Sequence, residues 1–126
     1  MDNSSSEKLI TQIKIEVIKW TAKTNKDWSA LLLIMIGDED DMGFECYAYD
    51  KTGKRQFVNI DNDALFDWIE ELQDLTWVPG NKPWVAAALR VVNPSLEHKL
   101  DYEFEDMDRW EEPVPYKKVS TFSESL

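Results

Sequence analysis

Two segments of the chain have the periodicity of helices. Residues 6–23 carry apolar side chains at intervals of three and four, at Leu9, Ile13, Val17 and Trp20. Residues 62–74 repeat this spacing at Leu65, Trp68, Leu72 and Leu75. A single apolar stripe is typical of a helix that packs one face on a core. Ser4 and Glu7 have capping-box spacing before the first helix, and Asp61 is a candidate N-cap for the second.

The region between these helices predicts three strands. Residues 28–36 contain the run LLLIMI, which is typical of a strand buried on both faces. Residues 44–49 alternate apolar and polar side chains, and residues 55–60 follow a tight turn centred on Gly53. Short turns between three strands predict an antiparallel meander.

The second half of the chain predicts one further hairpin. The alanines of residues 85–92 are compatible with a helix and the valines with a strand. Turn residues at 93–95 follow directly, and residues 96–105 alternate, so we favour two paired strands. After Asp106, two prolines interrupt any regular pairing.

The order α-β-β-β-α-β-β predicts an α+β fold, in which two helices pack on an antiparallel sheet of about five strands. A length of 126 residues fits one domain, residues 1–126, whose core is large enough to be stable without disulfides or metals. We expect residues 1–5 and 119–126 to be frayed.

The formal net charge of -11 restricts the kinds of partner. Contacts to nucleic-acid phosphates need clustered Lys and Arg, so we expect no nucleic-acid binding. An acidic surface favours fast association with a basic protein, although acidity also serves solubility alone. No apolar run is long enough to span a bilayer, and the single cysteine fits a reducing compartment. We therefore expect a cytoplasmic protein without a membrane partner.

The candidate catalytic residues lack the neighbours that catalysis needs. His98 stands between two charged residues, and Cys46 has no local base or cation. The acidic run 38–41 fails as an EF-hand, because Met42 and Tyr49 occupy ligand positions. A carboxylate enzyme would require an apolar pocket that raises one carboxyl pKa. We expect no enzyme, no cofactor and no metal.

The stretch 100–112, LDYEFEDMDRWEE, holds seven carboxylates opposed only by Arg109. Its alternation predicts that Tyr102 and Phe104 face inward while Asp101, Glu103 and Glu105 face away. Residues 106–112 have no evident structural role. Trp110 is either an aromatic anchor for a partner, together with Tyr116, or part of the core.

These residues carry a resemblance to the YezG-like immunity family. Members of that family have a strand that opens with tryptophan, a short turn and a closing strand of the form "vdYdYed". Here Trp84 opens NKPWVAAALRVV, and the closing strand is LDYEFED. The resemblance extends over residues 9–110, although the turn is Asn-Pro-Ser where the family usually has Asp-Gly. The matching residues are Trp84, Asp101, Tyr102, Glu103, Phe104 and Glu105.

The resemblance implies an immunity protein, or antitoxin, of a bacterial polymorphic-toxin or contact-dependent growth inhibition system. Such a protein binds a basic C-terminal toxin domain, often a nuclease, and needs no cofactor. The alternative is a non-catalytic acidic adaptor subunit of another complex; the oligomeric state stays open. The candidate toxin-binding residues are Asp38, Glu39, Asp40, Asp41, Glu70, Glu71, Glu103, Glu105, Asp106, Asp108, Trp110, Glu111 and Glu112.

Overall fold

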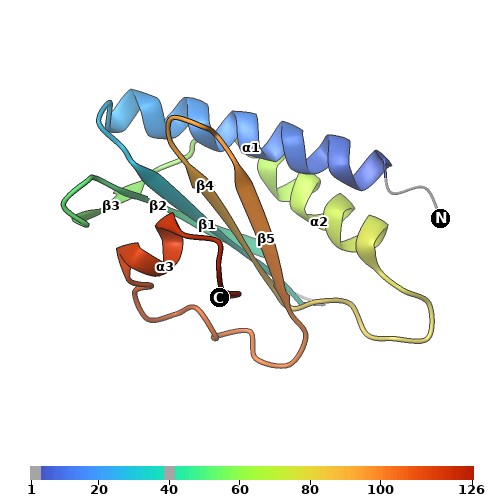
Figure 1. Cartoon of the computed structure of the whole chain (residues 1–126). Coiled ribbons are helices and arrows are strands. Elements are labelled where there is room, and N and C mark those ends of the chain that lie inside the picture. The colour runs from blue at the N-terminus through green and yellow to red at the C-terminus, as the bar shows by residue number, and fades with distance from the viewer. Residues whose placement is uncertain (1–3, 39–41) are drawn as a thin grey trace.

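The computed structural model describes residues 4–38 and 42–126 (Figure 1). Its elements are α1 (Ser4–Thr24), β1 (Ala30–Gly37), β2 (Met42–Tyr49), β3 (Arg55–Val58), α2 (Ala64–Thr76), β4 (Ala86–Val92), β5 (His98–Glu103) and α3 (Tyr116–Ser120). The predicted α+β class and the order of the first seven elements are confirmed. The short helix α3 is an addition that the sequence pattern did not predict.

The five strands form one antiparallel sheet in the order β3-β2-β1-β4-β5. β1 is central, and its Leu33 lies opposite Cys46 of β2 and Leu89 of β4. All residues of β1 except Ile36 are buried, which confirms the expected strand with two covered faces. The interpretation of residues 85–92 as a strand is also confirmed. α2 lies in the connection between β3, at one edge of the sheet, and β4, which pairs with β1 on the side away from β2.

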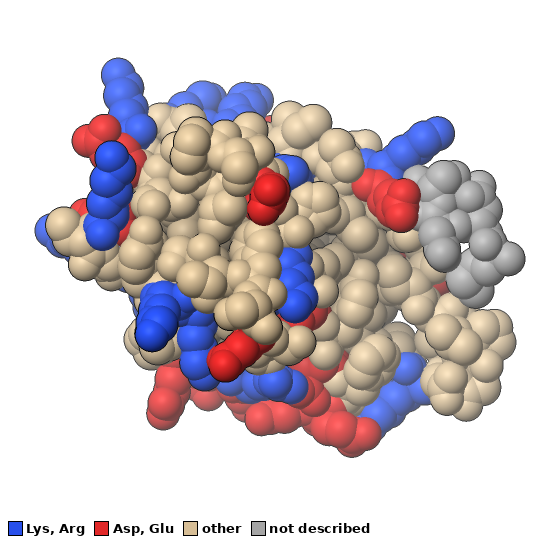
Figure 2. Space-filling model, viewed as in Figure 1, with Lys and Arg blue, Asp and Glu red and all other residues tan. Residues whose placement is uncertain are grey.

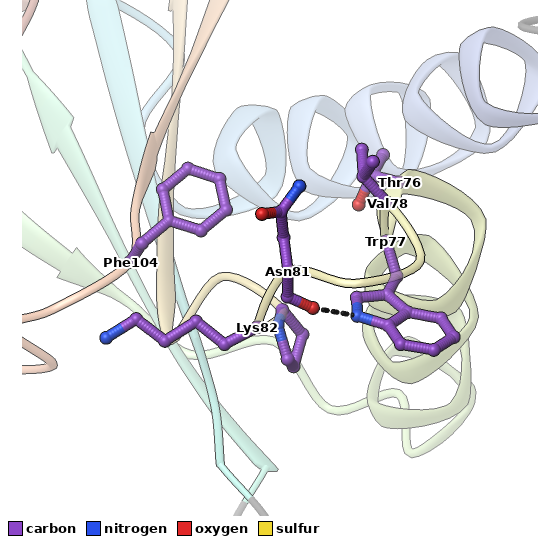
Figure 3. A pocket seen from close by; sticks show the side chains of 7 residues that line it. Thr76, Trp77, Val78, Asn81, Lys82 and Phe104 are labelled. Carbon is purple, nitrogen blue, oxygen red and sulfur yellow. Dashed lines mark hydrogen bonds between the residues drawn. The ribbon is translucent and has the colours of Figure 1, made fainter.

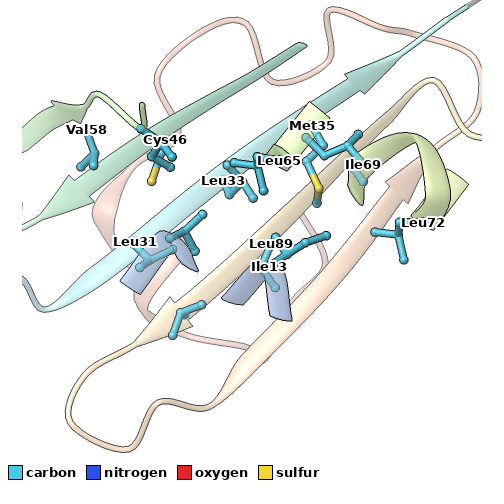
Figure 4. Packing of buried hydrophobic residues seen from close by; sticks show 14 of the residues in the cluster. Ile13, Leu31, Leu33, Met35, Cys46, Val58, Leu65, Ile69, Leu72 and Leu89 are labelled. Atoms are coloured by element: carbon cyan, nitrogen blue, oxygen red, sulfur yellow. The ribbon is translucent and has the colours of Figure 1, made fainter. Parts of the chain in front are cut away.

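Helices α1 and α2 cover one face of the sheet (Figures 1 and 4). The apolar stripe of each helix packs on the inward side chains of β1 and β4, as the periodicity predicts. The fully buried members from these four elements are Ile13, Val17, Leu31, Leu33, Met35, Leu65, Ile69, Leu72, Ala87, Leu89 and Val91. Burial of each large aliphatic side chain stabilises the fold by about 1.5–3 kcal/mol.

The C-terminal segment, residues 104–126, covers part of the opposite face of the sheet. Trp110, Val114 and Val119 belong to a second apolar cluster with Leu32 and Ala88, which point away from α1 and α2. Val119 in α3 is completely buried. The expectation that residues 119–126 are frayed is therefore wrong, because this segment buries apolar side chains and binds a buried arginine.

That arginine is Arg90 of β4, whose side chain is fully buried between the sheet and the C-terminal segment. Its Nη1 donates to the main-chain oxygens of Lys118, Thr121 and Glu124, at 2.9, 3.0 and 3.1 Å. Its Nη2 donates to Asp101 Oδ2 on β5 at 2.8 Å. One guanidinium thus joins the last two strands to the end of the chain.

Several element ends differ from the predicted ones. α1 begins at Ser4, two residues before the expected start, and β3 ends at Val58 rather than at residue 60. Ser4 and Ser5 are therefore helical rather than frayed, and Ser4 is not a cap before the helix; residues 1–3 lie outside the described residues. α2 begins at Ala64, and its main-chain N–H donates to the Asn62 side chain at 3.0 Å. Asn62 therefore serves this helix start in place of the expected Asp61 cap.

Candidate protein-binding surface

Several elements meet at the end of the sheet where β1 finishes and β4 begins. Gln73 of α2 fixes this junction, because its Nε2 donates to the main-chain oxygens of Gly37 at 2.9 Å and Trp84 at 2.6 Å. β5 finishes at the same end, since Glu103 lies opposite Ala86. We call this the groove end of the molecule. It brings together the end of β1 at Gly37, the C-terminal half of α2 and the end of β5 at Glu103.

The outer face of α2, whose C-terminal half lies at the groove end, carries unneutralised carboxylates. Asp67, Glu70, Glu71 and Asp74 are all exposed. They form no ion pair with any residue that the structure describes. Residues 56–81 contain six carboxylates and no Lys, Arg or His, so no cation close in sequence offsets them. The predicted candidates Glu70 and Glu71 therefore lie in an open acidic surface.

The carboxylates at the end of β5 are instead neutralised within the protein. Glu103 Oε1 accepts from Arg109 Nη1 at 2.6 Å, and Glu105 Oε2 accepts from Lys82 Nζ at 2.6 Å. The Arg109 guanidinium, with the main-chain N–H groups of Glu105 and Asp106, lowers the pKa of Glu103 to about 2. These predicted binding residues already have cationic partners of their own.

The remaining acidic candidates lie on the segment that connects β5 to α3. Asp106, Asp108, Glu111 and Glu112 are exposed and take part in no ion pair among residues 4–38 and 42–126. Figure 2 shows Asp and Glu gathered along the lower edge, where Figure 1 places this connection. Asp38 is exposed as well, whereas the candidates Glu39, Asp40 and Asp41 lie outside the described residues.

The two predicted aromatic anchors serve the fold. Trp110 is only 5% exposed and belongs to the apolar cluster beneath the C-terminal segment, so the core alternative is correct. Tyr116 is half-buried, with its hydroxyl 2.8 Å from Ser29 Oγ and its ring 6.1 Å from that of Tyr49. Residues 106–112 therefore do have a structural role, since Trp110 ties them to the sheet.

The exposed apolar side chains of the groove end are ones that the sequence reasoning did not select. Trp77, Val78 and Phe104 are 45%, 52% and 45% exposed. They line a groove of about 340 Å³ together with Thr76, Asn81, Lys82 and Pro83 (Figure 3). The expectation that Phe104 faces inward is wrong, because β5 ends at Glu103 and the alternation ends with it.

The groove has apolar sides and a small number of polar groups (Figure 3). Phe104 stands on one side and Trp77 on the other, with Asn81 and Lys82 between them. The Trp77 indole N–H donates to the Asn81 main-chain oxygen at 2.5 Å, which holds the ring against its own loop. The Asn81 side-chain amide has no hydrogen-bond partner among the residues that the structure describes.

One sequence signal pointed to this groove. Trp77, Val78 and Pro79 follow the α2 stripe immediately, in a stretch whose prolines and glycine exclude a continued helix. Large apolar residues in a connecting loop either fold back onto the core or remain at the surface as a contact site. Sequence alone does not separate these outcomes, and the structure shows the second.

Burial and neighbouring groups shift the pKa values of the two residues considered for catalysis, Cys46 and His98. Burial raises the pKa of the Cys46 thiol to about 12, despite its contact with Thr21 Oγ1 at 4.0 Å. His98 Nδ1 lies 3.0 Å from Lys14 Nζ, and desolvation with this nearby cation lowers the His98 pKa. No carboxylate is among the described residues that line the groove. No cluster of three potential metal ligands occurs among residues 4–38 and 42–126. The described lining offers a partner apolar surface and a small number of hydrogen-bonding groups.

The sequence matches no protein-family model and no curated protein. Within the part of the chain that the structure describes, no helix has the length and apolar character needed to cross a membrane.

Proposed function

We propose that this protein is a cytoplasmic immunity protein that binds and neutralises a basic protein toxin through its groove end. The observation that carries the proposal is the adjacency of an unneutralised acidic helix face and an exposed apolar groove. Protein interfaces commonly combine a few aromatic or aliphatic anchors with a charged rim. The resemblance of Trp84 and the strand LDYEFED to the YezG-like family supports the choice of an immunity protein within this class.

The charge of the surface suits a toxin that acts on nucleic acid. A nuclease binds phosphates in a cleft lined by Lys and Arg. Asp67, Glu70, Glu71 and Asp74 offer carboxylates at close spacing on a rigid helix, which can occupy or cover such a cleft. Long-range attraction then increases the rate of capture before specific contacts form. Rapid capture benefits an inhibitor that must act before the enzyme damages its host.

The proposal is tested by co-expressing this chain with the product of the gene immediately upstream. We expect the chain to restore growth when that product is toxic, and the two proteins to elute as one complex in gel filtration. Toxicity that persists, or separate elution of the two proteins, would contradict the proposal. Isolation of a stable complex with a non-toxic cytoplasmic protein instead would favour the alternative, an acidic adaptor subunit.

A further inference from the structure

We propose that the groove lined by Trp77, Val78 and Phe104 receives one large apolar side chain from a basic segment of a protein partner. The inference deepens the proposed function and rests on it only in taking the partner to be a protein. It assigns different roles to the two features of the groove end. The acidic face of α2 attracts the partner, and the groove holds it.

The size of the groove suits a single side chain with its flanking backbone. At about 340 Å³, its volume lies at the lower limit of the range of about 300–1,000 Å³ typical of small-molecule pockets. Its sides are Phe104, Val78, Pro83 and the Trp77 ring, which all present apolar surface. An aromatic or long aliphatic side chain placed between them would cover surface that is now exposed to water.

The polar groups of the groove are suited to a peptide backbone. The free amide of Asn81 offers one acceptor and two donors between the two apolar sides. A main-chain N–H or C=O beside the inserted side chain can pair with it. Because this amide forms no hydrogen bond within the described protein, a main-chain partner replaces its bonds to water without breaking an internal one.

Charge complementarity identifies the flanking residues as basic. Asp74 stands three positions before Trp77, and Glu105 and Asp106 follow Phe104 directly. Among the described residues that line the groove, Lys82 is the one cation, and Glu105 already neutralises it. Both members of that ion pair are more than half exposed, so the pair contributes little to stability. An arginine of the partner can therefore replace Lys82 on Glu105 at small cost and add a bidentate contact.

Two short peptides test the inference on the full chain without the toxin. Acetylated, amidated Lys-Arg-Phe-Lys-Arg and Lys-Arg-Ala-Lys-Arg have the same charge and differ only in the central side chain. Each is titrated into the ¹⁵N-labelled protein, and the Trp77 indole N–H and Asn81 side-chain amide signals are followed. We expect the Phe peptide to bind at least about fivefold more tightly than the Ala peptide and to shift these signals.

Matched variants locate the site. Phe104→Ala should remove the preference for the Phe peptide. Phe57→Ala, which truncates a phenylalanine 56% exposed on the opposite edge strand β3, should retain it. Equal binding of the two peptides, shifts away from the groove, or equal behaviour of the two variants would overturn the inference. Because no toxin is present, these outcomes are independent of the co-expression result, which alone decides the proposed function.

Discussion

Arg90 is a buried residue that links the end of the chain to the sheet. Its guanidinium donates hydrogen bonds to three main-chain oxygens of the C-terminal segment and to Asp101 of β5. A sequence does not indicate which main-chain oxygens will accept such hydrogen bonds, because every residue has one. The pattern WVAAALRVV places Arg90 in a strand but gives no indication of what the guanidinium binds.

Replacement of this arginine should destabilise the fold strongly. Arg90→Met leaves the Asp101 carboxylate without its buried partner, so we expect a loss of about 3–5 kcal/mol in the free energy of unfolding. Urea titration measures this, and Lys117→Met, at an exposed lysine of the same segment, is the control. A loss below about 1 kcal/mol, the range of surface ion pairs, would show that Arg90 does not hold the segment.

Glu103 should make stability depend on pH in the acidic range. Its pKa in the folded protein is about 2, below the ordinary value for glutamate of about 4.3. The charged form therefore stabilises the fold fully above pH 4.3, and this contribution is lost as the pH falls toward 2. We expect the wild type to exceed Glu103→Gln in stability at pH 7, with a difference that falls steeply between about pH 4.3 and pH 2.

A second background identifies the group responsible for this dependence. Arg109 is the main cause of the lowered pKa, so the same comparison in an Arg109→Met background should show a smaller pH-dependent difference. Urea titrations at pH 7, 5, 3 and 2 give all four free energies. A difference between wild type and Glu103→Gln that is constant over this range would contradict the prediction.

At the scale of elements, α2 carries charge that does not favour its own stability. Asp74 lies in its last turn, where the helix dipole is negative and no basic residue is present. A carboxylate there is unfavourable, whereas Asp67 in the first turn is favourable. The proposed binding surface gives Asp74 a role that its effect on helix stability does not.

One substitution at each end of α2 tests whether the helix dipole governs how these charges affect the free energy of unfolding. Asp74→Lys should raise the free energy of unfolding by about 0.3–1 kcal/mol, because it places a cation at the negative end of the dipole. Asp67→Lys makes the same change of charge at the positive end and should lower stability. Thermal unfolding at low salt measures both. The same sign for both variants would show that the dipole does not govern these positions.

The sequence predicted the helices and strands better than it predicted the segment that covers the second face of the sheet. Apolar spacing located α1, α2 and all five strands, because burial of one face imposes a period on the chain. The C-terminal segment has no such period: it is held by single contacts, the buried Trp110 and the carbonyls bound by Arg90. Of the predicted site, Glu70 and Glu71 remain open, whereas Glu103 and Glu105 are neutralised by Arg109 and Lys82. Lys82 is distant from Glu105 along the chain, and the turn that brings Arg109 back to Glu103 has no periodic pattern, so neither pairing is visible in the sequence.

At the scale of the whole molecule, the two ends of the sheet differ in their balance of charge. The hollow at the end opposite the groove is lined by Lys26 and Lys51 together with Asp27 and Asp50, so charges of both signs occur there. Blue and red side chains both stand at the left of Figure 2, the side on which Figure 1 shows the β2–β3 turn. The carboxylates on the outer face of α2, in contrast, form no ion pair with any described residue. A basic partner is therefore attracted more strongly to α2 than to the opposite end, so charge orients the encounter as well as accelerating it.

The most direct test of this account is the association rate with the toxin at low salt, measured by stopped flow for two variants of equal net charge. Glu70→Lys/Glu71→Lys alters the acidic helix face, and Asp27→Lys/Glu97→Lys makes the same change at the opposite end. We predict that the first variant associates roughly tenfold more slowly than the second, with a difference that shrinks as salt screens the charges. Equal association rates for the two variants would contradict the claim that the groove end captures the toxin.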